Sequence, residues 1–397
     1  MVYEQWRVSS GFVRDKPLVF FATLAAGGGH VATARAMAEG LEAASPGTFS
    51  VTVSDYMNDL GLTARDRRHK TSWAWMLAHP WSARYAQRLL DTFPKAMNRY
   101  QRRTLDTVAR RAADHLEGLE PALVVVNHGW LMVALTRAQQ HYGLQARVLT
   151  FATEPLDASA LWAEAEAQRV VVASRAALDD LSRYGVSEQK VDLVGYPVQG
   201  AFLRAPHKAD ARAALGLSER LTCLVSLGSE GVGNHAEETV RSLLEHPLEP
   251  YVVVVAGHNA KLKRRLEPLP RVRALGFIGN MADYLAACDV VVGKAGPASV
   301  LEALAVGRPV LAVSYAGLNE AKLVRFLERK QLGAYVPGKL LLADKLRHFA
   351  EPSEQARVSE RARALGLDVM TGNLGAYLAE AATHGFPEEP LRLRGLG

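Results

Sequence analysis

Short apolar runs alternate with longer amphipathic stretches along most of the chain. Continuous apolar runs bounded by turn residues are typical of strands buried on both faces. Strands that alternate with helical patterns indicate a parallel sheet covered by helices. The runs predict strands at residues 18–24, 49–53, 122–126, 147–151, 169–173, 221–227, 251–256, 290–292 and 309–313. We therefore expect an α/β fold built from doubly wound parallel sheets.

The alternation is interrupted once, near residue 200, by a connection that bears Gly195 and Pro197. A new strand then begins at residue 221, and both halves open with a strand followed by a glycine-rich turn. Two similar halves predict two Rossmann-like domains that face each other across a cleft. We place these domains at residues 1–200 and 201–375, followed by a tail at 376–397, with helical character at 373–382.

Composition indicates a globular protein. The 397 residues, 49% hydrophobic and 22% charged, suffice for two domains with a large core. Cys223 and Cys288 lie in apolar patterns, so we expect them in the core rather than in a disulfide or a metal site. No run reaches the ~20 apolar residues of a membrane-spanning helix. The N-terminus lacks the apolar region of a signal peptide, and we expect a cytoplasmic location.

The glycine-rich turn of the first half is Gly27, Gly28 and Gly29, followed by His30. Glycines at such a turn let the backbone approach a ligand closely. The spacing also fits a relaxed dinucleotide fingerprint, with Asp55 as its later acid. The helix dipole disfavours a cationic His30, and a neutral imidazole can accept a proton or orient a hydroxyl. The alternative, that His30 merely caps its own helix, is equally compatible with the motif.

The second half places polar groups where two neighbouring strands end. Lys294 closes the strand at 290–292, Glu302 follows in a helix expected at 299–306, and Asn319 and Glu320 follow the next strand. Ligands of doubly wound folds bind at the carboxyl ends of the strands. A helix N-terminus suits phosphates, and carboxylates suit sugar hydroxyls. This arrangement favours a bound sugar nucleotide.

Five motifs occur in order along the chain: GGGH at 27–30, LGSEG at 227–231, GFIGNM at 276–281, KAGPASVLEAL at 294–304 and NE at 319–320. Together they resemble the GT-B glycosyltransferases. Within these they are most similar to the monogalactosyldiacylglycerol synthase and processive diacylglycerol glucosyltransferase family, relatives of the MurG-type peptidoglycan enzymes. The resemblance implies an inverting, metal-independent hexosyltransferase without a cofactor. It would use a UDP-sugar as co-substrate and a lipid acceptor such as diacylglycerol, at the inner face of the membrane.

The resemblance also implies roles for individual residues. The first domain would bind the acceptor, with His30 between donor and acceptor, and the second domain would bind the nucleotide sugar. In that domain the turn around Ser229 would meet the diphosphate, Phe277 and Ile278 would read the uracil with Met281 nearby, Glu302 would hold the ribose, and Asn319 and Glu320 the hexose. The full donor-binding set is Gly228, Ser229, Glu230, Phe277, Ile278, Met281, Lys294, Gly296, Pro297, Ser299, Glu302, Asn319 and Glu320.

The chain departs from this family in the acceptor half. The lipid-galactosylating members carry an Asp, a proposed base, two residues before the glycines, and Ala25 stands there. A Thr-Asp segment of the family appears as Thr153-Glu154. His30 is therefore our first candidate for the general base, and Glu154 and Asp55 are weaker candidates.

A basic and aromatic stretch at residues 65–111 carries twelve Lys and Arg against three Asp. Cations and amphipathic rings are typical of segments that contact anionic lipid, although a helical subdomain with charged outer faces has the same composition. Because the resemblance implies a lipid acceptor, we favour membrane contact through Arg67, Arg68, Lys70, Trp73 and Trp75. Nucleic acid is disfavoured because no recognised binding module accompanies the charge.

Three other functions are compatible with parts of the sequence. A sugar-nucleotide epimerase or hydrolase, or a transferase with a soluble acceptor, would keep the fold without a membrane-facing stretch. A nicotinamide-dependent oxidoreductase would use the first glycine-rich turn and leave residues 228–320 unexplained. A non-catalytic sugar-nucleotide-binding protein would account for Ala25.

Overall fold

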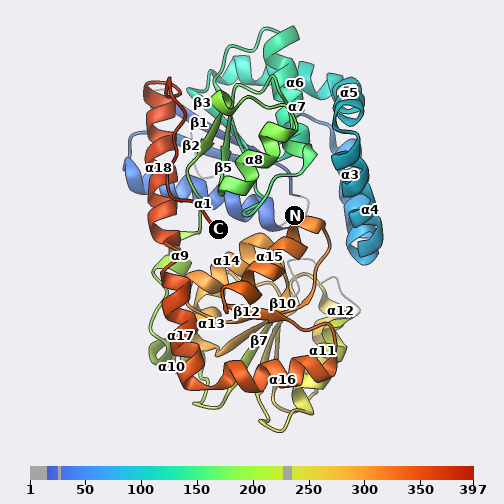
Figure 1. Ribbon diagram of the computed structural model, residues 1–397, viewed down its shortest axis with the longest axis vertical. Coiled ribbons are helices and arrows are strands. Elements are labelled where there is room, and N and C mark those ends of the chain that lie inside the picture. Colours follow the sequence, from blue (N-terminus) through green and yellow to red (C-terminus); the bar gives the residue numbers. More distant parts are fainter. Residues whose placement is uncertain (1–15, 26–27, 227–234) are drawn as a thin grey trace.

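The computed structural model describes residues 16–25, 28–226 and 235–397, and these form two parallel sheets of six strands each. The first sheet has the order β2-β1-β3-β4-β5-β6 and the second β12-β11-β10-β7-β8-β9. Figure 1 shows the two domains one above the other, each with helices on both faces of its sheet. The predicted α/β fold of two Rossmann-like domains is confirmed.

Nine of these strands lie where the apolar runs predicted them, and the other three, β6, β9 and β12, were not predicted from the sequence. The first sheet comprises β1 (Leu18–Thr23), β2 (Ser50–Asp55), β3 (Leu123–Val126), β4 (Val148–Phe151), β5 (Arg169–Val172) and β6 (Val191–Leu193). The second comprises β7 (Thr222–Ser226), β8 (Tyr251–Val255), β9 (Val272–Leu275), β10 (Val290–Lys294), β11 (Val310–Ser314) and β12 (Gly333–Tyr335). Central strands such as β3 are buried along their whole length, which explains their continuous apolar sequence.

Helices connect and cover these strands. Those of the first domain are α1 (Gly28–Ala44), α2 (Tyr56–Asp59), α3 (Thr63–Ala78), α4 (Pro80–Thr92), α5 (Pro94–Thr104), α6 (Asp106–Leu119), α7 (Gly129–His141) and α8 (Arg175–Arg183). The link and the second domain contain α9 (Gly200–Leu203), α10 (Lys208–Leu215), α11 (His235–Leu244), α12 (Ala260–Leu266), α13 (Met281–Ala287), α14 (Pro297–Ala305), α15 (Leu318–Arg329), α16 (Lys339–Ala350), α17 (Pro352–Arg363) and α18 (Leu367–Thr383). Pro80 and Pro94 begin α4 and α5, where their missing N–H groups cost nothing. None of the described helices is long and apolar enough to cross a bilayer.

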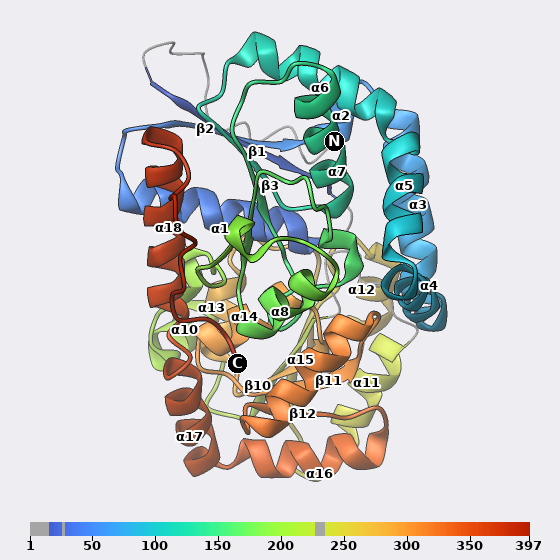
Figure 2. The same cartoon turned by 45° about the horizontal axis from the view of Figure 1, so that its top comes forward.

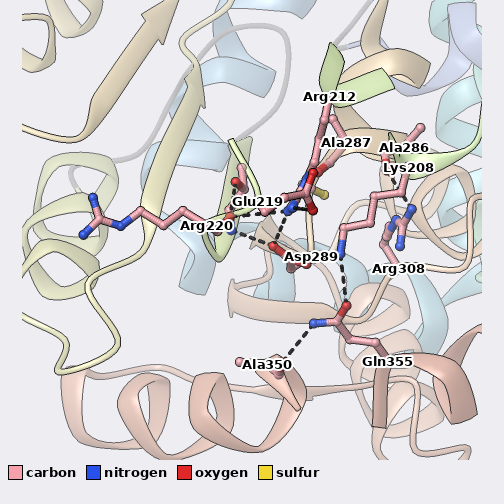
Figure 3. Close-up of polar contacts among 12 residues, drawn as sticks. Lys208, Arg212, Glu219, Arg220, Ala286, Ala287, Asp289, Arg308, Ala350 and Gln355 are labelled. Carbon is pink, nitrogen blue, oxygen red and sulfur yellow. Dashed lines mark hydrogen bonds and ion pairs between the residues drawn. The ribbon is translucent and has the colours of Figure 1, made fainter. Parts of the chain in front are cut away.

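A buried ion-pair network joins the link to the second sheet (Figure 3). Asp289, just before β10, accepts hydrogen bonds from Arg212 Nη2 at 2.8 Å and from the Thr222 backbone N–H at 2.6 Å, and pairs with Lys208. Arg212 and Asp289 are almost fully buried. One carboxylate thus fastens α10 to the starts of β7 and β10. Cys223 and Cys288 lie close by as buried free thiols, as predicted.

The chain returns to the first domain through α18, which packs against α1 (Figure 1). The two helices meet at glycines, since a Cβ built on Gly375 would lie 2.2 Å from the backbone O of Gly40. The last residues then run beside the first sheet, where the Leu393 N–H donates to the Leu193 O at 2.8 Å and the Leu396 N–H to the Ala173 O at 2.7 Å. The expected helical character at 373–382 is therefore the second half of a longer helix that holds the two domains together.

Candidate functional site

His30 lies in the first turn of α1, at the carboxyl edge of the first sheet. Its Nδ1 is 2.8 Å from the backbone O of Asn127, which directly follows β3. Because a carbonyl oxygen can only accept, Nδ1 carries the proton and Nε2 keeps its lone pair. The ring thus bonds to a neighbouring strand end rather than capping its own helix. Burial lowers the pKa of His30 to about 4, so the neutral ring can accept a proton from a hydroxyl through Nε2.

Further polar rings surround His30, and we call His30, His69, Asn127, His128 and Trp130 the imidazole cluster. The rings of His30 and His128 are 4.9 Å apart, and those of His128 and His69 are 5.5 Å apart. His128 Nδ1 accepts from the Trp130 backbone N–H at 3.2 Å, so its Nε2 carries the proton. Burial lowers the pKa of His128 and His69 as well. The cluster therefore offers a proton acceptor and a proton donor side by side, both on neutral rings.

His69, Asn127, His128 and Trp130 were not singled out as site residues from the sequence. Asn127 and His128 carry a signal that could have found them, since they are the polar residues directly after an apolar strand. His69 carries no such signal, because only the tertiary packing of α3 brings it next to His128 and Trp130.

Ala25, at the position of the family's proposed base, is held through its backbone. Its N–H donates to Asp55 Oδ1 at 3.1 Å, and Asp55 Oδ2 accepts from Lys70 at 2.7 Å and from Asn58 at 2.6 Å. Asp55 is therefore engaged in shaping the turn that leads to the glycines. Lys70 also pairs with Asp66 at 2.6 Å, so its ammonium points toward the domain.

Glu154, the other candidate base, follows β4 and is buried. Its carboxylate accepts from the Ser159 backbone N–H at 2.6 Å and from the Ser159 hydroxyl at 3.0 Å. Burial and the nearby Asp157 raise the pKa of Glu154 to about 8, which would make it a proton carrier near neutral pH. Among the described residues, the hydrogen bonds of Glu154 go to Ser159 and not to His30.

The predicted donor side comprises β10, α14 and the start of α15. Gly296 precedes α14 and Pro297 is its first residue, and Ser299 is exposed in its first turn. Unpaired N–H groups of this turn favour an anion. Lys294 Nζ lies 2.8 Å from Glu320 Oε1, and Glu320 sits beside Asn319 in the first turn of α15. The structure thus brings together a cation, a carboxylate, an amide and a helix N-terminus from two separate segments.

Glu302 lies further along α14 and faces the first domain. It lines a narrow cavity between the domains together with Thr33 of α1 and Pro197 and Gln199 of the link. Burial raises the pKa of its carboxyl group to about 7. A carboxylate in this place is a hydrogen-bond acceptor, and its charged form is disfavoured by the poor hydration of the cavity.

Of the other predicted donor residues, Phe277 and Ile278 lie on the loop before α13. Phe277 is 58% exposed and stacks on His258 with ring centroids 5.0 Å apart. Ile278 is partly buried, and Met281 begins α13. Gly27, Gly228, Ser229 and Glu230 lie outside the described residues, whereas Gly28 and Gly29 begin α1. Among the described residues, no group of three or more His, Cys, Asp or Glu could hold a metal ion.

The basic and aromatic stretch forms α3, α4, α5 and the start of α6, and α3, α4 and α5 make a helical layer on the outside of the first domain (Figure 2). Arg67 and Arg68 are exposed, in contrast to Lys70, and Trp75 is 51% exposed. The side chain of Trp73 is outside the description. Further exposed rings on these helices and their connections are Trp81, Tyr85, Phe93 and Tyr100.

Comparison with known families agrees with this geometry, because residues 222–362 match the glycosyltransferase family 28 C-terminal domain. The matched residues lie in the second half of the chain. The matched segment contains β10, α14 and the start of α15. These elements make up the predicted donor side, apart from the residues that face it from the first domain. The resemblance to this group of enzymes, drawn from the five motifs, is confirmed.

Curated relatives cover most of the chain. Monogalactosyldiacylglycerol synthase 1 of Arabidopsis thaliana is 24% identical over 344 residues, which are 82% of this chain and 63% of the plant protein. An N-acetylglucosamine transferase of Alkaliphilus metalliredigens, named for UDP-N-acetylglucosamine and pyrophosphoryl-undecaprenol, is 27% identical over 51% of this chain and 58% of its own. The chain thus spans less than two thirds of the length of these relatives.

Solved structures establish the GT-B fold over nearly the whole chain. A glycosyltransferase of Rickettsia africae matches with a TM-score of 0.57 at 12% identity, covering 93% of this chain and 99% of its own. SnogD of Streptomyces nogalater matches with a TM-score of 0.54 at 17% identity, covering 93% and 100%. Anabaena HepE in complex with UDP and glucose matches with a TM-score of 0.55 at 15% identity, covering 93% and 100%.

Proposed function

We propose that this protein transfers a hexose from a UDP-sugar to a lipid hydroxyl, such as that of diacylglycerol, with inversion at the anomeric carbon. The observation that supports this most is the pairing of a family 28 domain with a neutral imidazole cluster in the opposite half. The donor class draws on relatives and neighbours named for UDP or a UDP-sugar. The lipid acceptor draws on relatives named for a diacylglycerol and a polyprenol.

The reaction would be a single in-line displacement. The acceptor oxygen attacks the anomeric carbon while the bond to the diphosphate oxygen breaks, and that oxygen leaves with the electron pair. His30 Nε2 takes the hydroxyl proton as the oxygen loses it. The N-terminus of α14 and Lys294 would stabilise the charge that develops on the leaving diphosphate, so the proposal assigns no resident metal.

We assign both residues of the Lys294–Glu320 ion pair a role in donor binding. Its 2.8 Å contact holds opposite charges at the place proposed for the diphosphate and the hexose. We propose that the donor separates them, with Lys294 turning to the diphosphate. Glu320 would then accept hydrogen bonds from hexose hydroxyls, and Asn319 would accept from them or donate to them. Glu302 would accept from the two ribose hydroxyls.

Product analysis tests the reaction. The protein is incubated with UDP-glucose or UDP-galactose and with vesicles that contain diacylglycerol, and the lipid extract is examined for a new glycolipid of inverted anomeric configuration. His30→Ala is the matched control. Free hexose without a lipid product would indicate a hydrolase, and UDP binding without turnover would indicate a non-catalytic binding protein.

We further propose that α3, α4 and α5 contact an anionic membrane surface. Arg67 and Arg68 supply exposed charge, and Trp75 and its neighbouring rings supply amphipathic side chains for the headgroup region. Each cation near an anionic surface contributes about 1 kcal/mol. Lys70 is left out of the contact because Asp55 and Asp66 bind its ammonium.

Vesicle flotation tests this contact. The protein should float with anionic vesicles and far less with neutral ones, and salt should release it. Arg67→Glu with Arg68→Glu should reduce flotation. The control, Arg347→Glu with Arg363→Glu, makes the same charge change on α16 and α17 of the other domain and should not. Equal flotation with both kinds of vesicle, or with neither, would leave α3, α4 and α5 as an ordinary helical subdomain.

A further inference from the structure

Lys322 belongs to the second domain but places its ammonium in the first. It lies in α15, one turn from the segment that carries Asn319 and Glu320. Its Nζ is 2.9 Å from Asp157 Oδ2 and 3.6 Å from Asp180 Oδ2. The side chains of Asp157 and Asp180 are only 5% and 10% exposed. The contact therefore joins the donor half to the acceptor half through partly dehydrated charges.

The pocket that receives Lys322 is rich in acids. Asp157 and Asp180 lie near Glu154 and Asp91, and Asp91 accepts from the Ala160 backbone N–H at 2.9 Å. The one other cation paired here in the described residues is Arg183, which binds Asp180 and is itself largely exposed. Lys322 is thus the main cation that balances the carboxylates of this pocket. The Lys322 side chain is 43% exposed, so water reaches the ammonium from one side while the carboxylates that bind it are buried.

Two further contacts hold the same segment from the first domain. The Leu318 backbone N–H donates to Gln87 Oε1 of α4 at 2.8 Å. The Arg84 guanidinium lies 5.7 Å from the centre of the Tyr315 ring. Residues 315–322 therefore contact the first domain at several points, on α4 and on the acidic loop after β4.

We infer that Lys322 is a cross-domain positioning residue, which sets the segment bearing Asn319 and Glu320 against the acceptor domain in the arrangement that transfer requires. The inference rests on the proposed function for its effect on turnover. Lys322 itself touches neither donor nor acceptor in this role. Its loss should therefore lower kcat while the affinity for UDP stays nearly unchanged.

Lys322→Met is the test, because methionine keeps most of the stem and removes the charge. Lys322→Arg is the conservative variant, and Arg325→Met, on the exposed side of the same helix, is the matched control. Three quantities are compared: the Kd for UDP by calorimetry, kcat for transfer to lipid, and backbone hydrogen exchange in residues 315–322. We expect Lys322→Met to keep the Kd within about twofold, to lower kcat at least tenfold and to speed the exchange. Lys322→Arg should recover most of the activity and the control all of it.

A second variant separates the loss of the contact from misfolding of the protein. Lys322→Met combined with Asp157→Leu replaces the buried pair by apolar groups, which proteins often tolerate, and it should show the same loss of kcat. A kcat within twofold of the wild type, or a lowered kcat with unchanged exchange, would overturn the inference. If the wild type binds no UDP and transfers nothing, the proposed function fails. The exchange comparison still decides whether Lys322 holds the segment.

Discussion

Glu302 allows the donor site to be tested through its charge. Its carboxyl group lines the cavity between the domains, and burial raises its pKa to about 7. If ribose hydroxyls donate to the ionised carboxylate, only the ionised fraction of the protein binds the donor well. Acid protonates Glu302, so the affinity should fall as the pH is lowered through 7.

The size of this effect follows from that pKa. At pH 8 the carboxyl group is about nine-tenths ionised and at pH 6 about one-tenth, so the Kd should weaken about tenfold between the two, or ~1.4 kcal/mol. His30 does not interfere, because its pKa of about 4 keeps it neutral throughout. Glu154, with a pKa of about 8, does titrate in this range, and a variant must separate the two.

The assay is calorimetric titration with UDP-glucose at pH 6, 7 and 8. This donor is the better probe because its diphosphate stays fully ionised over the range, whereas free UDP titrates. Glu302→Gln keeps the shape of the side chain and should bind weakly at every pH, with no slope. A wild-type Kd that does not change with pH, or the same slope in Glu302→Gln, would refute the ribose role of Glu302.

Three further predictions concern catalysis and stability. His30→Ala should lower turnover at saturating donor by ~10²–10⁴-fold with little change in the Kd for UDP, and a near wild-type rate would move the base role to Glu154. Gly375→Ala should lower the free energy of unfolding by ~1–3 kcal/mol in a denaturant titration, because the new methyl group meets the Gly40 carbonyl; unchanged stability would mean that α18 shifts freely. Asp289→Ala should cost ~3–5 kcal/mol in the same assay, because it leaves two cations without their shared carboxylate, and a cost below 1 kcal/mol would argue against that network.

Much of the donor half could be predicted along the chain, because its determinants are local. The apolar run at β10, the Gly296-Pro297 start of α14 and the acid within that helix lie within one short segment. A strand buried on both faces needs an unbroken apolar run, and a helix that starts at a strand end needs turn residues there. Pro80 and Pro94 are equally local signals, since each is the first residue of its helix, α4 or α5.

What these residues bind to was decided by the tertiary structure. The tautomer of His30 depends on a carbonyl 97 positions later, at the end of β3. Lys70 stood in the basic stretch as a candidate for membrane contact, yet Asp55 and Asp66 hold its ammonium. Lys322, in an ordinary amphipathic helix, reaches Asp157 only because the two domains close on each other.

The sequence by itself therefore determined which segments become strands and helices, and which strand ends carry polar groups, since periodicity and turn chemistry act over a few residues. The tertiary structure alone decided the partner, the protonation state and the exposure of each of those groups. The reason is physical: the pKa of an imidazole or a carboxyl group, and the strength of an ion pair, depend on the water and the charges around it. Those surroundings come from segments that are distant along the chain.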